Sequence, residues 1–316
     1  MIIERTFTLE LEIVPYFSKF YKMEVAGYPS YIANCVLSVF LCYTTIMLNS
    51  VTIHAIRKTS SLPKPLKTLL LSLAASDLCV GLLVQPVQIT VLVMQLDRNA
   101  ENSPTFKSTY LTYVAVVNLF YYTSFFSVTA LSLDRFLAVR LHLRYQELVT
   151  HKRVVAVVIS IWVFGALLSL IWVLLRARED RYAVYVTVEM FCLITAALLY
   201  YNIYLAVRRH TKQIRSLQIQ REAQNGEMAN AARLRKSAIG TLYVYLVFLF
   251  CYLPQNSIYF ATFIYEWSTA LNVLLHYSLT VAFLNSSLNP LIYCWKMTDI
   301  RHAVIDILRK ILPSEN

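Results

Sequence analysis

The sequence is short of charge, glycine and proline. Asp, Glu, Lys and Arg make up only 15% of its 316 residues and hydrophobic residues make up 58%, whereas a soluble domain carries about 25% charged residues. Five Gly and nine Pro leave little room for long loops or disordered segments. These shortages exclude an ordinary soluble domain and indicate an integral membrane protein.

Motifs of enzymes are also missing. The sequence contains no metal-hydrolase motif, no catalytic-nucleophile arrangement and no phosphate-binding loop, so we expect no enzymatic activity and no required cofactor. Residues 1–30 lack a basic stretch followed by an apolar core, which predicts that no signal peptide is cleaved. All six cysteines lie inside hydrophobic segments, so we expect no disulfide: Cys35, Cys42, Cys79, Cys192, Cys251 and Cys294.

Long apolar segments are what the sequence does have. Seven of them are near or above the roughly 20 residues that a helix needs to cross a bilayer, and none alternates like a transmembrane β-strand. They predict an all-α membrane protein, a seven-transmembrane helix bundle over residues 31–294. The predicted spans are 31–56, 66–94, 108–138, 154–174, 182–207, 238–265 and 270–294.

The basic residues indicate the orientation of these spans. With the N-terminus outside, twenty Lys and Arg fall on the inner side and eight on the outer side, and cytoplasmic segments are normally the richer in positive charge. We therefore expect an extracellular tail over residues 1–30 and a cytoplasmic segment over residues 295–316. Because the basic residues flank the spans and form no soluble domain, the net charge of +11 indicates topology and not nucleic-acid binding.

The cytoplasmic segment 295–316 has the spacing of a short amphipathic helix. Apolar residues recur every three or four positions, with charged residues between them. This pattern predicts a helix that lies on the membrane surface and contacts lipids. Its apolar positions are Met297, Ile300, Val304, Leu308 and Ile311.

Two prolines lie inside predicted spans. Pro290, in the Asn-Pro-Leu-Ile-Tyr run that ends at Tyr293, removes a backbone hydrogen bond near the end of the seventh span and kinks the helix. Asn289 beside it can satisfy freed polar groups where no water is available. Pro254 is the hinge candidate of the sixth span.

Each predicted span carries a short motif, and the seven motifs follow one another in order. They are Asn49 in the first span, the run from Leu71 to Leu78 in the second, Asp134-Arg135-Phe136 in the third, Trp162 in the fourth, Tyr201 to Tyr204 in the fifth, Phe248 to Pro254 in the sixth and Asn289 to Tyr293 in the seventh. The set resembles that of the rhodopsin-like (class A) G-protein-coupled receptors over nearly the whole chain.

This resemblance implies a plasma-membrane receptor that binds an extracellular ligand (a peptide, lipid or small molecule) and activates a heterotrimeric G protein. Arg135 would contact the G protein, and Asp134 would hold Arg135 until that partner binds. Tyr201 and Tyr293 would close onto Arg135 in the active state. Tyr252 stands where the family has the Trp whose ring shifts with activation. The expected switch residues are Asp134, Arg135, Tyr201, Tyr252, Pro254, Asn289, Pro290 and Tyr293.

Asp77 is a carboxylate in the middle of a predicted span, and such a residue is a functional candidate by default. Its neighbourhood resembles the sodium pocket of the family, which implies an allosteric Na⁺ that favours the inactive state. The alternative is a neutral, hydrogen-bonded Asp packed among amides. The candidate sodium site comprises Asn49, Asp77, Ser124, Asn285, Ser286 and Asn289.

A ligand pocket is expected in the outer half of the bundle. Glu189 is its main clue, because a carboxylate at this depth needs a cation, a donor or water. It could bind a basic group of a ligand, or it could be protonated or bonded to a neighbouring helix. Gln255 and Asn256 could equally join helices to each other. The candidate pocket residues are Asn118, Tyr121, Glu189, Tyr252, Gln255, Asn256, Tyr259, His276 and Phe283.

Several departures from the family pattern restrict which receptor subfamilies the sequence can resemble. Phe283 replaces the lysine that an opsin needs, and Val117 replaces the aspartate of amine receptors. Tyr110 stands where the family usually has the cysteine of its outer disulfide, and Leu193 stands where it has a proline. Leu234 replaces the acid of the inner ionic latch, which suggests basal activity. These features resemble the melanocortin, cannabinoid and lysophospholipid receptor branch, and a divergent orphan lineage fits as well.

Two other functions remain alternatives at the level of the sequence. A transporter or channel would need charges along a pathway, or inverted repeats with broken helices, and the sequence has no internal repeat. A receptor-shaped scaffold that no longer signals is favoured by Phe136 and Tyr252, which depart from the family motifs.

Overall fold

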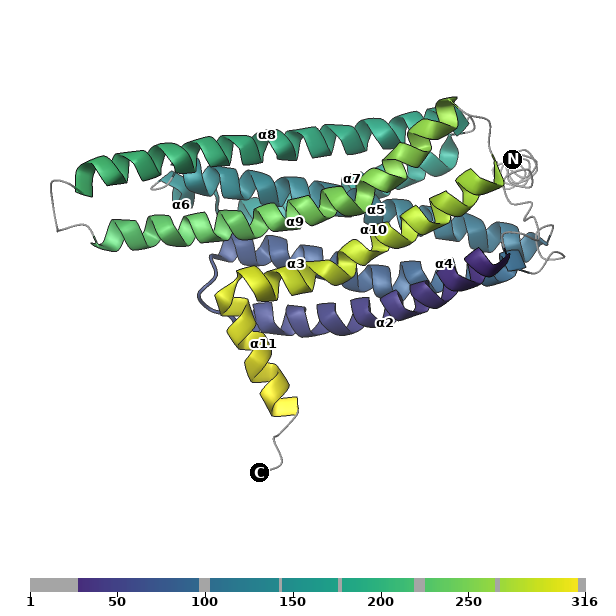
Figure 1. Cartoon of the computed structure of the whole chain (residues 1–316), viewed down its shortest axis with the longest axis horizontal. Helices are drawn as coiled ribbons and strands as arrows, with labels where there is room; N and C mark the ends of the chain where they lie inside the picture. Colours follow the sequence, from purple (N-terminus) through teal and green to yellow (C-terminus); the bar gives the residue numbers. More distant parts are fainter. Residues whose placement is uncertain are drawn as a thin grey trace.

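The structure is a computed structural model that describes residues 28–96, 103–141, 144–175, 178–218, 225–264 and 268–311. All regular structure in these residues is helical, so the prediction of an all-α bundle is confirmed (Figure 1). The predicted extracellular tail lies almost wholly outside the described residues. The elements are α2 (Tyr28–Lys58), α3 (Lys64–Cys79), η2 (Val80–Val84), α4 (Gln85–Leu96), α5 (Pro104–Leu141), α6 (Tyr145–Leu148), α7 (His151–Leu174), α8 (Arg178–Gln218), α9 (Asn225–Ile264), α10 (Thr269–Lys296) and α11 (Thr298–Ile311).

The long helices lie side by side along one axis, with α3, η2 and α4 joined into a single rod (Figure 1). Six stretches in the described residues have the length and the apolar composition to cross a membrane: Pro29–Lys58, Lys64–Leu96, Pro104–Leu141, His151–Leu174, Ala183–Ala206 and Ile239–Ala261. The seventh rod, α10, has 28 residues, which at about 1.5 Å per residue also exceeds a bilayer core of about 30 Å. The chain is a multi-pass membrane protein.

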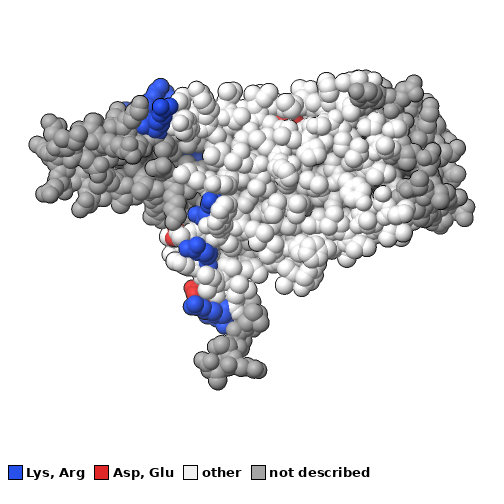
Figure 2. Space-filling model, viewed as in Figure 1, with Lys and Arg blue, Asp and Glu red and all other residues white. Residues whose placement is uncertain are grey.

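The inner face of α10 is polar. The buried polar residues of α10 are His276, Ser278, Thr280, Asn285, Ser286, Ser287 and Asn289. By contrast, large apolar side chains such as Phe191 and Phe250 point out of the bundle. Figure 2 shows a middle with almost no charged residues, and Lys and Arg gathered at the end that carries α11. Apolar residues outside and polar residues inside are what a bundle in lipid requires.

Close helix contacts depend on small residues. A Cβ atom added to Gly165 of α7 would lie 2.8 Å from Oγ1 of Thr123 on α5, and one added to Gly81 would lie 2.9 Å from Cγ1 of Ile46 on α2. Both distances are below van der Waals contact, so only glycine allows these helices to approach as they do. Such small residues at interfaces are typical of membrane bundles.

The second rod contains a π-helical turn, η2, that the hydropathy pattern does not predict. Pro86 follows it and has no backbone N–H, so it cannot donate to the carbonyl one turn back. The N–H of Gln85, which in an α-helix would donate to the carbonyl four residues earlier, donates to the carbonyl of Val80, five residues earlier. The extra residue in this turn changes the direction in which the side chains of α4 point.

The short C-terminal helix α11 turns away from α10 (Figure 1). It packs against α2 and α10 through Ile300, Ala303 and Ile307. The predicted amphipathic helix is thus present, but its buried face is narrower than expected. Leu308 is 43% exposed, because it lies about 100° from Ile307 around the helix and so points off the packed face. The side chain of Ile311 lies outside the described set.

Candidate functional site

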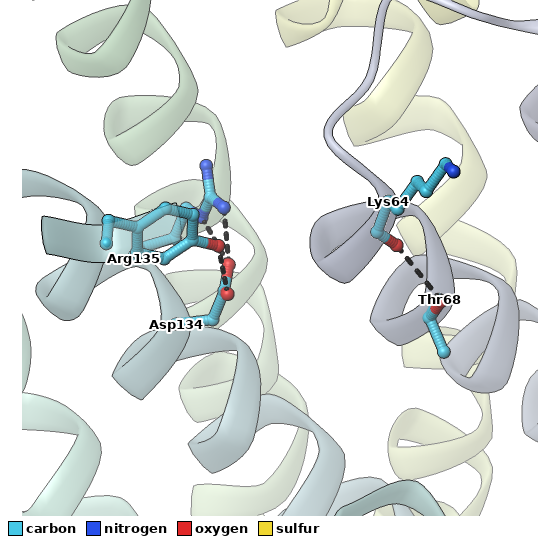
Figure 3. Close-up of polar contacts among 5 residues, drawn as sticks. Lys64, Thr68, Asp134 and Arg135 are labelled. Carbon is cyan, nitrogen blue, oxygen red and sulfur yellow. Dashed lines mark hydrogen bonds and ion pairs between the residues drawn. The ribbon is translucent and has the colours of Figure 1, made fainter. Parts of the chain in front are cut away.

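Asp134 and Arg135, at the α11 end of α5, form a buried ion pair (Figure 3). The Arg135 Nε donates to the Asp134 carboxylate over 2.9 Å, and the Nη2 donates to the same oxygen. The hydroxyl of Tyr145 on α6 donates to the other oxygen over 2.6 Å. Burial and the Asp134 charge both raise the pKa of Tyr145 above its ordinary value, so the phenol keeps the proton that it donates. Asp134 therefore holds Arg135 from one side while Tyr145 holds Asp134 from the other.

One of the two tyrosines predicted to close onto Arg135 is placed differently from the sequence prediction. Tyr201 was expected to close onto Arg135 in the active state, but its side chain is 60% exposed. Tyr200 is buried in its place and stacks on Tyr245 of α9, with ring centroids 5.2 Å apart. One residue turns a side chain by about 100° on a helix, so only one of two adjacent tyrosines can face inward. Tyr293 on α10 is buried, as expected of a switch residue.

The buried face of α8 carries a signal that separates the two tyrosines. Its buried residues include Glu189, Cys192, Ala196, Tyr200 and Ile203, which recur every three or four positions. Tyr200 continues this periodicity and Tyr201 breaks it. The motif alone selected the exposed residue, whereas helical periodicity selects the buried one.

The middle of the bundle contains Asp77, which is fully buried on α3. The Nδ2 of Asn289 donates to its Oδ2 over 2.9 Å. Asn49 lies on the neighbouring α2 and donates to the backbone carbonyls of Thr45 and Ser286, each over 2.9 Å. The structure thus brings Asp77 and Asn289 together directly and joins Asn49 to the same segment of α10. Ser124 and Asn285 are also buried.

Four oxygens of the candidate sodium site have no hydrogen-bond partner within the described part of the chain. They are Oδ1 of Asp77, Asn49, Asn285 and Asn289. A hard cation prefers carboxylate and amide oxygens as ligands, so this donor set fits a small cation such as Na⁺.

A buried aromatic cluster connects the outer half of the bundle with the proline of α9. It consists of Tyr121, Phe125, Tyr185, Phe248 and Tyr252, and the partly buried Tyr259 packs against it. Tyr252 lies at its centre, with its ring 5.2 Å from Tyr121 and 4.8 Å from Phe125. Tyr121 stacks on Tyr185 at 4.3 Å. Tyr252 is two residues from Pro254, which lies inside α9, so a displaced ring would act directly beside the proline.

Glu189 is fully buried beside this cluster. Its carboxylate accepts hydrogen bonds from two neighbouring helices. Tyr121 of α5 donates to its Oε2, and Asn256 of α9 donates to its Oε1. Gln255 donates to the hydroxyls of Tyr185, over 2.7 Å, and Tyr259, over 3.1 Å. Of the two roles that the sequence left open for Glu189, the structure contains the bond to neighbouring helices.

The other predicted pocket residues take part in packing. Asn118 donates to the carbonyl of Val114 in its own helix over 2.9 Å. His276 lies edge-on to the ring of Tyr31 on α2, with centroids 5.1 Å apart. Phe283 packs in a separate apolar cluster with Val84 and others. All three residues are buried in the interior of the bundle.

The sequence did not single out four further features. Tyr145 holds Asp134, Tyr200 takes the inner place on α8, and Lys296 lies over two aromatic rings at the end of α10. The fourth is a row of buried glutamines on α4. The glutamines could have been found, because polar residues inside an apolar span are rare and functional by default. Tyr145 could not, because it belongs to no periodic pattern.

Long helices that expose apolar side chains define a membrane protein, and a buried arginine is held at one end of it. The sequence agrees, since the model of the family described as "7 transmembrane receptor (rhodopsin family)" matches residues 48–197 and 176–293. Similar proteins include adenosine receptor A2a of Canis lupus familiaris, 26% identical over 84% of this chain and 69% of the relative. Adenosine receptor A2b of Gallus gallus is 24% identical over 88% of both chains. Melanocortin receptor 5 of Homo sapiens is 24% identical over 86% of this chain and 83% of the relative.

The chain belongs to the rhodopsin family of seven-transmembrane receptors. It is a G-protein-coupled receptor and not an enzyme. The family implies coupling to a G protein and an extracellular ligand. Both adenosine and melanocortin receptors are similar to it at comparable identity, so the comparisons support the family as a whole and not one branch of it.

Proposed function

We propose that this receptor lies in the plasma membrane with its N-terminus outside, and that an extracellular ligand shifts it toward a state in which Arg135 contacts a heterotrimeric G protein. The Asp134–Arg135 pair, held by Tyr145, carries this proposal. Two buried charges and a phenol at the basic end of the bundle (Figure 2) form an arrangement that a partner with a better acceptor can open. Opening it exposes a cation to that partner.

The ligand signal would reach Arg135 through α9. The ring centroid of Tyr252 lies 5.2 Å from that of Tyr121 on α5 and 4.3 Å from that of Phe248, one turn earlier on α9. A ligand that moves Tyr121 therefore pushes on Tyr252, next to the proline of α9. The inner half of α9 then moves relative to α10, with which it shares its largest helix contact. A ligand shifts this equilibrium only by its difference in affinity for the two states.

The ligand site is proposed in the outer half of the bundle, around Glu189, Tyr121 and Asn256. A carboxylate among tyrosines suits a ligand that carries a donor or a cation. The similar receptors are named for adenosine and melanocortin, so adenosine and a melanocortin peptide are the first ligands to apply. The oxygens around Asp77 would hold Na⁺, whose charge would fix α3 against α10 in the resting state.

Nucleotide exchange on purified G proteins tests the coupling proposal. The receptor is placed in lipid nanodiscs, and exchange on each main Gα class is measured without ligand, with adenosine and with a melanocortin peptide. Arg135→Ala should abolish any receptor-dependent exchange. Arg140→Ala removes the same charge from an exposed site on the same helix and should retain most of it.

Two results would oppose the proposal. Equal exchange by the wild type and Arg135→Ala would show that this arginine does not couple. Absence of exchange on every Gα class, in the presence of a ligand shown to bind, would instead identify a receptor-like scaffold that does not signal.

A further inference from the structure

Three glutamines on α4 are buried without hydrogen bonds. Gln85, Gln88 and Gln95 are 0%, 1% and 2% exposed. Neither the amide nitrogen nor the amide oxygen of any of the three has a partner in the part of the chain that the structure describes. We call this row the glutamine stripe. Six unsatisfied amide atoms in one short helix are unusual, because buried polar groups in native proteins are nearly always paired.

The glutamine stripe occupies one face of α4. Spacings of three and seven residues place the three side chains within an arc of about 80° at 100° per residue. The stripe extends about 15 Å along the helix, from near the middle of the second rod to its outer end. The opposite, outward face carries exposed residues such as Pro86, Thr90 and Val93. The amides therefore point into the bundle and not into lipid.

Two other buried amides of the receptor behave differently. The Nε2 of Gln255 donates to two tyrosine hydroxyls, and the Nδ2 of Asn49 donates to two backbone carbonyls. These side chains join helices to each other. The glutamine stripe makes no hydrogen bond that joins α4 to another helix among the described residues, so polar stabilisation of the bundle does not explain it.

The helix next to the stripe adds one more unused donor. α2 packs against both α4 and α10. The Oδ1 of Asn34 on α2 accepts from Ser38 over 3.3 Å and from Thr280 of α10 over 3.0 Å, but its Nδ2 has no partner among the described residues. The interior of the outer half is thus rich in amide donors and acceptors that the receptor does not use itself.

The chemistry of the stripe restricts what can bind there. A primary amide offers two donors and one acceptor oxygen and has no charge. No residue of α4 is charged, so a charged ligand group would lose its hydration without gaining a counter-ion. A neutral group with a donor beside an acceptor can satisfy an amide at both of its atoms. Carboxamides, peptide bonds and lactam-type rings are groups of this kind.

We propose that Gln85, Gln88 and Gln95 form the recognition surface for a neutral, amide-like part of the ligand, separate from the carboxylate at Glu189. This inference rests on the proposal that the ligand binds in the outer half of the bundle. It deepens that proposal by dividing the ligand into two parts. One part is neutral and pairs with α4, and the other carries a donor or a cation and lies toward α8.

The first test measures whether a substitution raises or lowers the melting temperature, and it needs no ligand. Methionine has nearly the volume of glutamine and no hydrogen-bonding requirement. Gln88→Met and Gln95→Met should raise the melting temperature of the purified, ligand-free receptor, because each removes unsatisfied buried amide atoms. The matched control is Gln255→Met, which breaks two hydrogen bonds and should lower it. A lower melting temperature in both stripe variants would show that these glutamines bind within the fold, and the proposal would be wrong.

The second test uses three probes of one shape and different charge: benzamide, benzamidinium and benzoate. Their effect on the melting temperature is measured at millimolar concentration for the wild type, Gln88→Met/Gln95→Met and Glu189→Gln. Benzamide should stabilise the wild type most, and the double variant should lose at least half of that shift while Glu189→Gln keeps it. No stabilisation by benzamide, or equal stabilisation of the double variant, would overturn the proposal.

The same experiment distinguishes failure of this inference from failure of the proposed function. Benzamidinium could be the only probe that stabilises the receptor, with its effect lost in Glu189→Gln. That result would place recognition at the carboxylate and contradict the role of the stripe. It would leave the proposed receptor function intact. The melting temperatures are measured without a G protein, so they do not depend on coupling through Arg135.

Discussion

The ammonium of Lys296 lies between two aromatic rings at the α11 end of the bundle. Its Nζ is 3.4 Å from the centroid of Trp295 beside it on α10 and 3.8 Å from that of Tyr243 on α9. A Cβ atom added to Gly240, one turn before Tyr243, would lie 3.4 Å from Cβ of Lys296. α9 and α10 are therefore joined closely at the end where α9 must move to open the Arg135 site.

Lys296→Met should raise ligand-independent nucleotide exchange. A cation–π contact contributes about 0.5–2 kcal/mol, so its loss should shift the resting equilibrium about two- to thirtyfold toward the open state. Exchange is measured in nanodiscs at equal amounts of folded receptor. Lys310→Met, on an exposed site of α11, is the control and should change little. Unchanged or lower exchange in Lys296→Met would show that this contact does not restrain α9.

Tyr145→Phe should also raise basal exchange. The phenol donates to the Asp134 carboxylate, and a hydrogen bond to a charged group contributes about 1.5–3 kcal/mol. Without it, Asp134 holds Arg135 less firmly. The effect should vanish in the background of Asp134→Asn, because the acceptor has then lost its charge. Additive effects of the two substitutions would contradict a shared role, as a double-mutant cycle measures.

The sequence was sufficient to predict the fold because lipid imposes a simple rule. Runs of about 20 apolar residues must be helices, since only a helix satisfies its own backbone in hydrocarbon. The pairing of Asp77 with Asn289 was also predictable, because polar residues inside a span have few partners. The helices extend beyond the predicted spans, and α8 and α9 continue furthest past the apolar region.

The orientation of individual side chains was harder to predict. Motif matching selected Tyr201, but the rotation of α8 places Tyr200 inside. The π turn before Pro86 changes the inner face of α4, and no hydropathy pattern contains that extra residue. Contacts between distant segments, such as Tyr145 with Asp134 or Lys296 with Tyr243, depend on tertiary packing and leave no local signal.

Sodium should stabilise the ligand-free receptor through Asp77. Replacing K⁺ by Na⁺ at constant ionic strength should raise the melting temperature, since a ligand that binds only the folded state stabilises it by mass action. Asp77→Asn should abolish this difference. Glu189→Gln removes the other buried carboxylate of the outer and middle bundle and should leave it unchanged. A sodium effect that persists in Asp77→Asn would exclude this site.

Gly165→Ala should destabilise the receptor by forcing α7 away from α5. The new Cβ atom would lie 2.8 Å from Oγ1 of Thr123 and 3.4 Å from the carbonyl oxygen of Leu119. Overpacking of this kind typically costs about 1–3 kcal/mol. Thr123→Ala removes the nearest atom, so the double variant should regain part of the loss. Equal melting temperatures of Gly165→Ala and the wild type would show that the two helices can separate freely.

Glu189 and Tyr121 should be coupled energetically. Tyr121→Phe leaves one carboxylate oxygen without its donor, and Glu189→Gln weakens the acceptor, so each should destabilise the receptor by about 1–3 kcal/mol. In the double variant the combined loss should fall short of the sum by about 0.5–3 kcal/mol, as measured by chemical unfolding. Additive losses would mean that the two side chains act independently.

The same hydrogen bonds predict how a cationic ligand reaches Glu189. Both carboxylate oxygens already accept from the receptor itself, through Tyr121 and Asn256. A cation that takes the lone pairs used by these donors must displace them, and that displacement opposes binding. Tyr121→Phe should therefore raise the affinity for benzamidinium, whereas a residue that merely lines a pocket would lower it when truncated. Weaker benzamidinium binding in Tyr121→Phe, measured by calorimetry, would show that Tyr121 assists the ligand and does not compete with it.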